Sequence, residues 1–129
     1  MPIIEPAAAR GFATEWVEAW NSHDIERILR HYTDDVEFSS PFVVTIAGEA
    51  TGTLRGKAAL RSYWTRALAG LPDLHFTLLD VLAGVSAVTL HYRGHRGPVA
   101  ETFHLDASGQ VRASLACYSV LPPSTETTS

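Results

Sequence analysis

The sequence predicts an α+β fold, because its two halves carry different hydrophobic periods. Up to about residue 70 the apolar side chains recur at helical spacing, whereas from Leu74 they alternate with polar ones. Short turn segments separate the later strands, which indicates an antiparallel meander. Helices followed by a sheet favour α+β over alternating βα units. We therefore expect three N-terminal helices packed against a curved, mostly antiparallel sheet, with a small, mostly apolar pocket between them.

Three segments before residue 72 have the pattern of helices. The first covers residues 6–21 and begins with Pro6, which suits a first helical turn because its missing N–H is not needed there. The second follows the turn at residues 21–24 and would place Ile25, Ile28, Leu29 and Tyr32 on one face. The third starts near Gly56 and stops at Gly70 and Pro72, as glycine and proline commonly end helices.

The remaining segments are predicted to be strands and one loop. Residues 36–38 alternate like a strand and stop before Pro41. The glycine-containing stretch 42–55 is predicted to be an irregular loop that has room for a short hairpin. Four further strands are expected at residues 74–82, 85–93, 98–105 and 110–120.

Length and composition favour one folded domain over residues 1–129, with an ordered core at about 6–120 and a flexible tail at 121–129. The net charge is −4 and no Lys/Arg cluster occurs, so nucleic acid is not an expected partner. No apolar run is long enough to span a membrane, and no signal peptide is recognisable, which favours the cytoplasm. The single cysteine, Cys117, has no partner for an internal disulfide.

Strand alternation predicts which side chains face the helices. A symmetric hairpin at residues 94–97 sets the register of the two central strands. The helix-covered face would then carry His75, Thr77, Leu79, Val81, Val88, Leu90, Tyr92, Val99, Glu101, Phe103, Leu105, Val111, Ala113, Leu115 and Cys117. The outer face would carry Thr89, His91, Arg93, Ala100, Thr102, His104, Arg112, Ser114, Ala116 and Tyr118.

Two polar groups interrupt the predicted apolar face, and both are candidate catalytic residues. Burial of Glu101 between Val99 and Phe103 would raise its pKa and suit it to proton transfer near neutral pH. The alternative is a structural ion pair with Arg55 or Arg96. The second candidate is His75.

No metal site and no cofactor are expected. His91, His95 and His104 lack metal-ligand spacing, because the first two flank a turn and no carboxylate shares their spacing. No nucleophile turn, phosphate-binding glycine loop or dinucleotide fingerprint is present either.

Three segments carry a family resemblance. Residues 24–41 resemble the second helix and first strand of the nuclear transport factor 2-like superfamily, which includes SnoaL-like polyketide cyclases and steroid Δ5-3-ketoisomerases. Residues 54–60 resemble the entry into its third helix, and residues 103–111 resemble its final hairpin. The resemblance covers nearly all of residues 6–120. It implies a cone-shaped fold, in which a strongly bent sheet wraps around helices and encloses a pocket, and it implies a homodimer.

The resemblance does not carry over the ketoisomerase residues intact. Those enzymes use an aspartate base, a tyrosine donor and a protonated aspartic acid. The base position falls on Ser40, the tyrosine position on Trp16 and the protonated-acid position on Glu101. A serine hydroxyl cannot replace a carboxylate base, so the resemblance implies the pocket and argues against a standard ketosteroid isomerase.

Three functions fit these observations. The first is an enzyme of isomerase, cyclase or dehydratase type that acts on an apolar or aromatic carbonyl compound. The second is a non-catalytic domain that binds a small hydrophobic molecule, and the third is an assembly protein.

A homodimer would join through the outer sheet face at Thr89, His91, Thr102, His104, Ser114 and Tyr118. The residues expected to line the pocket are Trp16, Tyr32, Phe38, Ser40, Tyr63, Trp64, Leu90, Tyr92, Phe103 and Leu115.

Overall fold

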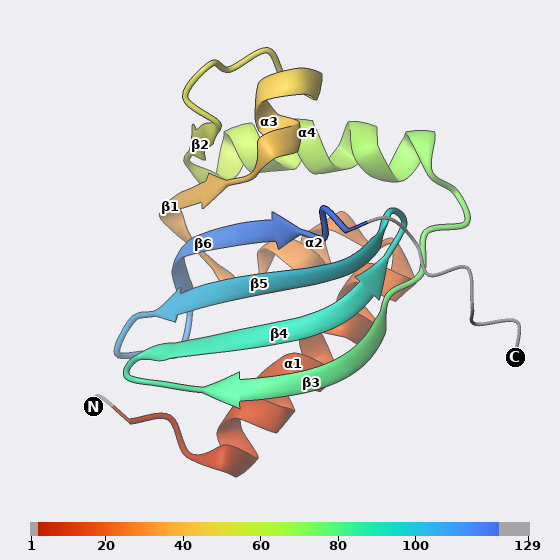
Figure 1. The fold of residues 1–129 in the computed structure, drawn as a ribbon. Coiled ribbons are helices and arrows are strands. Elements are labelled where there is room, and N and C mark those ends of the chain that lie inside the picture. The colour runs from red at the N-terminus through yellow and green to blue at the C-terminus, as the bar shows by residue number, and fades with distance from the viewer. Residues whose placement is uncertain (1–2, 122–129) are drawn as a thin grey trace, which may run out of the picture.

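Four helices and six strands make up the computed structural model, which describes residues 3–121 (Figure 1). The helices are α1 (Pro6–Ser22), α2 (Ile25–Leu29), α3 (Pro41–Ile46) and α4 (Lys57–Gly70). The strands are β1 (Tyr32–Ser39), β2 (Thr53–Arg55), β3 (Thr77–Ala83), β4 (Ala87–Gly94), β5 (Gly97–Leu105) and β6 (Val111–Tyr118).

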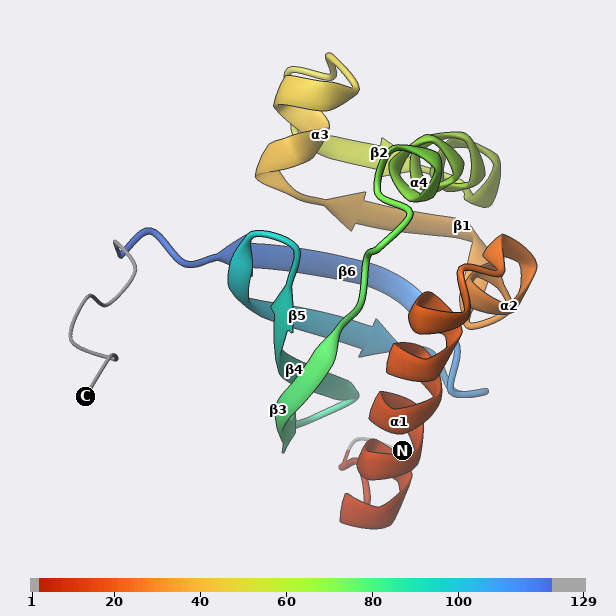
Figure 2. The same cartoon turned by 90° about the vertical axis from the view of Figure 1, so that its right-hand side faces the viewer.

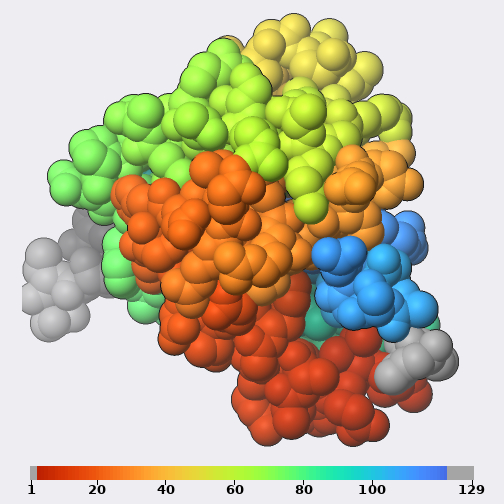
Figure 3. Space-filling view, turned by 180° about the vertical axis from the view of Figure 1, so that it is seen from behind, coloured from red at the N-terminus to blue at the C-terminus, as the bar shows by residue number. Residues whose placement is uncertain are grey.

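All six strands form one curved, unclosed sheet in the order β2-β1-β6-β5-β4-β3. Every neighbouring pair is antiparallel except β1 and β6, which run parallel. Seen from its end, the sheet has α1 and α2 on one side (Figure 2). Seen from behind, α1, α2 and α4 form a layer that hides most of the sheet (Figure 3). The predicted α+β fold with helices against a curved sheet is confirmed.

Helix α1 supplies much of the core, because Ala9, Ala13, Trp16 and Trp20 recur on its sheet-facing side and are buried. The helix ends where His23 adopts a left-handed backbone conformation with φ of 60°. The next residue caps α2, since the Asp24 carboxylate accepts hydrogen bonds from two backbone N–H groups.

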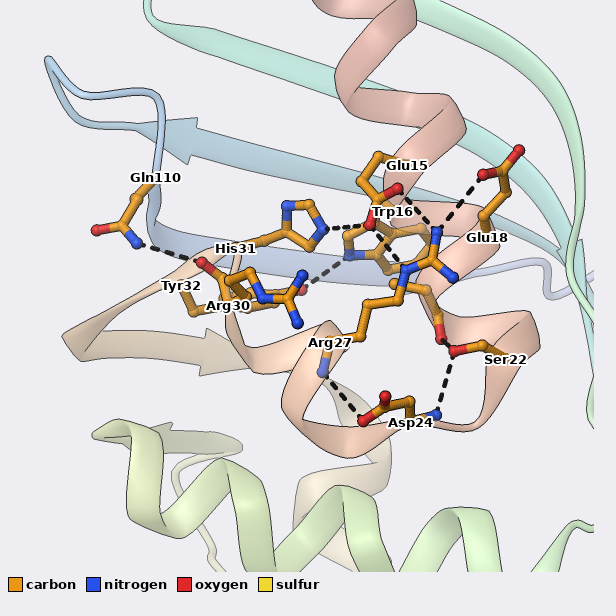
Figure 4. A network of polar contacts seen from close by, with 11 residues as sticks. Glu15, Trp16, Glu18, Ser22, Asp24, Arg27, Arg30, His31, Tyr32 and Gln110 are labelled. Carbon is orange, nitrogen blue, oxygen red and sulfur yellow. Dashed lines mark hydrogen bonds and ion pairs between the residues drawn. The ribbon is translucent and has the colours of Figure 1, made fainter.

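A polar network holds α2 against α1 (Figure 4). Arg27 donates two hydrogen bonds of 2.9 Å to the Glu15 carboxylate, and Nε2 of His31 lies 3.4 Å from the same carboxylate. The Arg27 hydrogen bond is the main reason that the pKa of Glu15 falls to about 2. Burial lowers the pKa of His31. The network fixes the turn that leads into β1.

Two predicted boundaries before residue 56 were wrong. The second helix ends at Leu29, and Tyr32 opens β1, because its backbone pairs with Val111 of β6. The predicted loop at 42–55 contains α3 and then β2, which pairs with β1 in an antiparallel ladder. A partner strand contributed from far along the chain leaves no local signal in residues 32–35.

The central hairpin has the predicted register, in which Gly94 lies opposite Gly97. Val88, Leu90, Tyr92, Val99, Glu101 and Phe103 therefore all point toward the helices and are buried. The register of the flanking strands differs from the prediction on both sides of this hairpin.

In β6, Arg112 is an extra residue, because Leu105 pairs with Val111 and His104 pairs with Ala113. This bulge reverses every later side chain. Leu115 is 48% exposed and Cys117 is also exposed, so their predicted inward positions were wrong. Ser114, Ala116 and Tyr118 lie on the inner face instead of the outer face: Ser114 and Ala116 are buried, and Tyr118 is partly buried.

A similar shift affects β3. The register with β4 slips at Leu79, which is 45% exposed, so the inward side chains before it are Phe76 and Leu78. His75 precedes the strand and is exposed, which contradicts its predicted place on the apolar face.

Within residues 3–121, no helix has the length and apolar character that crossing a membrane requires. The predicted tail lies outside the described residues, except for Leu121.

Candidate functional site

Glu101 is a buried acid on the inner face of β5. Its side chain is 3% exposed, and its neighbours across the sheet are Leu90 on β4 and Ala116 on β6. No basic side chain within residues 3–121 forms an ion pair with it, because Arg55 pairs with Glu37 and Arg96 lies over the Phe42 ring. The alternative prediction, in which Glu101 forms an ion pair with Arg55 or Arg96, is therefore wrong.

The environment of this carboxyl group changes its acidity. Burial raises the pKa of Glu101 to about 7, although the hydrogen bond from the Tyr92 hydroxyl acts in the opposite direction. Tyr92 donates its hydroxyl proton to Oε1 of Glu101 over 2.8 Å. At neutral pH the acid is therefore present in both protonation states, which suits a group that accepts and returns a proton.

Trp16 closes the space next to this acid. Its indole N–H donates to the Tyr32 hydroxyl over 2.9 Å (Figure 4). Its ring stacks on Phe76 with centroids 5.6 Å apart and also contacts Tyr92 and Phe103. Burial raises the pKa of both tyrosine hydroxyls well above the ordinary value, and the nearby Glu101 adds to this shift. The inner end of the cone is thus filled by aromatic rings.

A pocket of about 160 Å³ remains at the other end of the cone. Aromatic rings line it from α1, α3, α4, β1, β4, β6 and the segment before β3. Its hydroxyl groups come from Ser40, Tyr63, Tyr92 and Tyr118. The other lining residues are Trp20, Phe38, Phe42, Ile46, Trp64, Ala67, Leu71, Leu74, Phe76, Gly94, His95, Arg96 and Val99.

Tyr92 is the connection between the pocket and the buried acid. Glu101 is not among the lining residues, but Tyr92 lines the pocket and its hydroxyl binds Glu101. A molecule in the pocket would therefore contact Tyr92 and not Glu101 itself.

Three polar groups lie near the pocket, on Ser40, Tyr118 and Trp20. Ser40 is 4% exposed and caps α3, since its Oγ accepts from the backbone N–H of Phe42. Burial raises the pKa of Tyr118 to about 12, whereas a hydrogen bond with Ser40 lowers it. The indole nitrogen of Trp20 is buried and has no hydrogen-bond acceptor within residues 3–121.

Half of the predicted lining residues reach the pocket. Phe38, Ser40, Tyr63, Trp64 and Tyr92 line it. The other five do not: Trp16, Tyr32, Leu90 and Phe103 are buried in the core beneath it, and Leu115 lies on the outer face.

The sequence interpretation missed several lining residues, among them Phe42, Phe76, His95, Arg96 and Tyr118. Strand direction offered a signal for some of them. The hairpin turn at 94–97 and the carboxyl ends of β1 and β6 meet at one end of the sheet, because β5 runs antiparallel to β6 and β6 runs parallel to β1. Within residues 3–121, no three His, Cys, Asp or Glu side chains gather as metal ligands.

Comparison with known proteins places this arrangement in a family. The SnoaL-like domain matches residues 13–116, and the chain belongs to this family of the nuclear transport factor 2-like superfamily. A SnoaL-like protein of unknown function from Burkholderia thailandensis is 47% identical, with a TM-score of 0.89 over 91% of this chain and 98% of its own. No curated protein matches the chain.

More distant structures share only the fold. A protein with a cystatin-like fold from Methylobium petroleophilum is 20% identical, with a TM-score of 0.71 over 96% of this chain and 83% of its own. A protein with a ketosteroid isomerase-like fold from Catenulispora acidiphila, solved in complex with trimethylamine, is 19% identical. Its TM-score is 0.66 over 84% of this chain and 85% of its own.

Proposed function

We propose that the protein is an enzyme that moves a proton at the carbon next to a carbonyl group in a small apolar or aromatic compound. The hydrogen bond from Tyr92, a pocket-lining residue, to the buried Glu101 carries this proposal. Isomerisation, aldol cyclisation and dehydration all contain such a step. Membership of the SnoaL-like family supports the reaction class, because the fold family includes isomerases and cyclases.

The proposed step uses the direction of that hydrogen bond. Ionised Glu101 takes the hydroxyl proton of Tyr92 while the phenol oxygen takes a proton from the substrate carbon. The substrate becomes an enolate, Tyr92 stays neutral and Glu101 becomes protonated, so the proton count balances. A concerted transfer avoids a free phenolate, which the raised pKa of Tyr92 makes unfavourable. The Tyr118 hydroxyl, from a pocket-lining residue, is the donor proposed for the enolate oxygen.

Exchange of carbon-bound hydrogen for deuterium tests this step without knowledge of the final product. Phenylacetone in D₂O, followed by proton NMR, should lose its methylene signal faster with the protein than without it. Glu101→Gln and Tyr92→Phe should each slow the exchange by about 10²-fold or more. The rate should rise with pH through about 7, because the ionised form of Glu101 is the active one.

Glu5→Gln is the matched control, since Glu5 is an exposed residue that makes no side-chain cap at the start of α1. Its exchange rate should equal that of the wild type. No exchange above the buffer rate across a set of one-ring ketones, or equal rates for wild type and Glu101→Gln, would refute the enzyme proposal.

A specific observation favours binding without catalysis as the second candidate. Glu101 does not itself line the pocket, and most of the lining side chains are apolar. In this case one-ring ketones should bind, as detected by calorimetry, but the wild type should exchange no deuterium. Trp64→Ala should then reduce the affinity, because Trp64 is a lining ring.

We also propose that two copies associate through the outer sheet face. The bulge in β6 changes the predicted contact residues: Ser114 and Tyr118 leave this face, while the exposed Leu115 and Cys117 join Ala100 and His91. Light scattering at micromolar concentration should give a dimer mass, and Leu115→Arg should give a monomer. Val85→Arg, which changes an exposed apolar residue outside the strands, should leave the dimer intact.

A further inference from the structure

The charge at the pocket is positive. Arg96, in the turn between β4 and β5, lines the pocket, and among the described residues no Asp or Glu does so. The Arg96 guanidinium lies 4.5 Å from the centroid of the Phe42 ring, which also lines the pocket. No carboxylate within residues 3–121 forms an ion pair with Arg96. The guanidinium is held at the pocket while its hydrogen-bond donors remain available to an anion.

The size of the pocket limits the ligand. A dry protein cavity of about 150 Å³ holds one benzene molecule. The pocket volume of about 160 Å³ therefore suits a single ring. A fused multi-ring skeleton would have to displace Trp20, Trp64 or Phe76. The Trp20 ring packs against both of the others, and Phe76 stacks on Trp16.

The two ends of the pocket differ in the charge that they accept. Glu101 lies behind Tyr92, and its negative charge would repel a ligand carboxylate placed at that end. Trp20, Phe38 and Trp64 provide ring faces for an apolar group. The favourable position for a negative charge is next to Arg96, so a ligand would place its ring inward and its anionic group outward.

From these observations we propose that the pocket selects small one-ring carboxylic acids, with the carboxylate bound by Arg96. The inference rests on the proposed function only in using the same pocket, and it names the class of substrate on which the Tyr92–Glu101 pair would act.

Calorimetry with a matched pair of probes tests the selection. Cinnamate and its neutral amide, cinnamamide, have the same ring and chain. Cinnamate should bind about fivefold more tightly, which is the size expected of an exposed ion pair. The difference should shrink at high salt, because salt screens exposed charges. Anthracene-2-carboxylate, with three fused rings, should bind at least tenfold more weakly than cinnamate.

Variants of one hairpin assign the effect to a single side chain. Arg96→Gln should remove the preference for cinnamate over cinnamamide, and Arg96→Lys should retain it. Arg93→Gln is the matched control, because Arg93 is exposed in β4 and lies on the opposite face of the sheet. This substitution removes the same charge as Arg96→Gln. Its preference should equal that of the wild type.

Three outcomes would overturn the inference: equal affinity for the acid and the amide, equal effects of the Arg96 and Arg93 changes, or no binding of either probe at millimolar concentration. The exchange assay with phenylacetone is independent of these results, because that ketone carries no carboxylate. Retained exchange without charge selection would refute the ligand class and leave the proposed function in place.

Discussion

The two ends of the space between helices and sheet share the strands β4 and β5 but differ in what fills them. At the inner end, Trp16 is 1% exposed and packs against Tyr92 and Phe103 at centroid distances of 5.2 and 5.1 Å. At the outer end, the rings of Phe38 and Trp64 surround a pocket of about 160 Å³. The buried acid Glu101 lies at the filled end and Arg96 at the open end, so the fold separates the acid from the positive charge at the pocket.

The largest expected effect tests whether the inner end is filled by Trp16. Trp16→Ala should lower the free energy of unfolding by about 3–5 kcal/mol, because it leaves a cavity in a packed core and removes the hydrogen-bond donor to Tyr32. Phe42→Ala at the outer end should cost less, since Phe42 is only half-buried. Urea denaturation of both variants measures the difference, and equal losses would contradict the comparison.

A second effect sharpens the contrast in charge. The folded state holds the pKa of Glu101 at about 7, above the ordinary value of 4.5, so folding favours the protonated form. The stability that this gives is fully present below pH 4.5 and is lost as pH rises through 7. The loss amounts to about 3 kcal/mol.

Glu101→Gln cannot ionise and should lack this pH dependence. The difference in unfolding free energy between wild type and variant, measured with urea at several pH values from 4.5 to 8, should therefore change by about 3 kcal/mol in favour of the variant. A constant difference across this range would show that the Glu101 carboxyl is not desolvated.

A smaller effect concerns the link between the two ends. Tyr92→Phe removes the hydroxyl that donates to Glu101, which should cost about 1.5–3 kcal/mol when the acid is ionised. It should also raise the pKa of Glu101 further, because that hydrogen bond lowers it. Carbon NMR of the labelled glutamate carboxyls measures the shift, and a pKa that falls in the variant would refute the assigned geometry.

The smallest effect lies outside both ends and provides a baseline. Glu15→Gln weakens the network between α1 and α2, but the Glu15 side chain is 38% exposed, so solvent screening limits the cost to about 1 kcal/mol at neutral pH. The pKa of Glu15 is lowered to about 2, so its contribution is present above pH 4.5 and lost as pH falls toward 2. Thermal unfolding at pH 7 and pH 3 checks both values, with Glu5→Gln as the control, because Glu5 is exposed and makes no side-chain cap.

The sequence predicted the fold where the signal was local. The turn at residues 94–97 is short and symmetric, so alternation along β4 and β5 placed Leu90, Tyr92 and Phe103 on the inner face together with Glu101. The helix boundaries of α1 and α4 followed from proline, glycine and apolar spacing in the same way.

The prediction failed where one extra residue in a strand reverses the face of the sheet to which the neighbouring side chains point. Arg112 in β6 and Leu79 in β3 are ordinary strand residues in the sequence, and only pairing with the neighbouring strand identifies each one as a bulge. The consequences were the wrong faces for Leu115, Tyr118 and His75. The size of the pocket could not be predicted either, since it depends on how Trp16 fills the interior.

The parallel pairing of β1 and β6 has a consequence for synthesis of the chain. Tyr32 and Val111 are pairing partners separated by most of the domain. At a translation rate of about 5–20 residues per second, β1 waits several seconds on the ribosome before its partner emerges. Throughout this time β1 has only the three residues of β2 to pair with, and its other edge can pair with foreign strands. A chain that stops before residue 111 never closes the middle of its sheet, so premature termination would yield a product prone to aggregation.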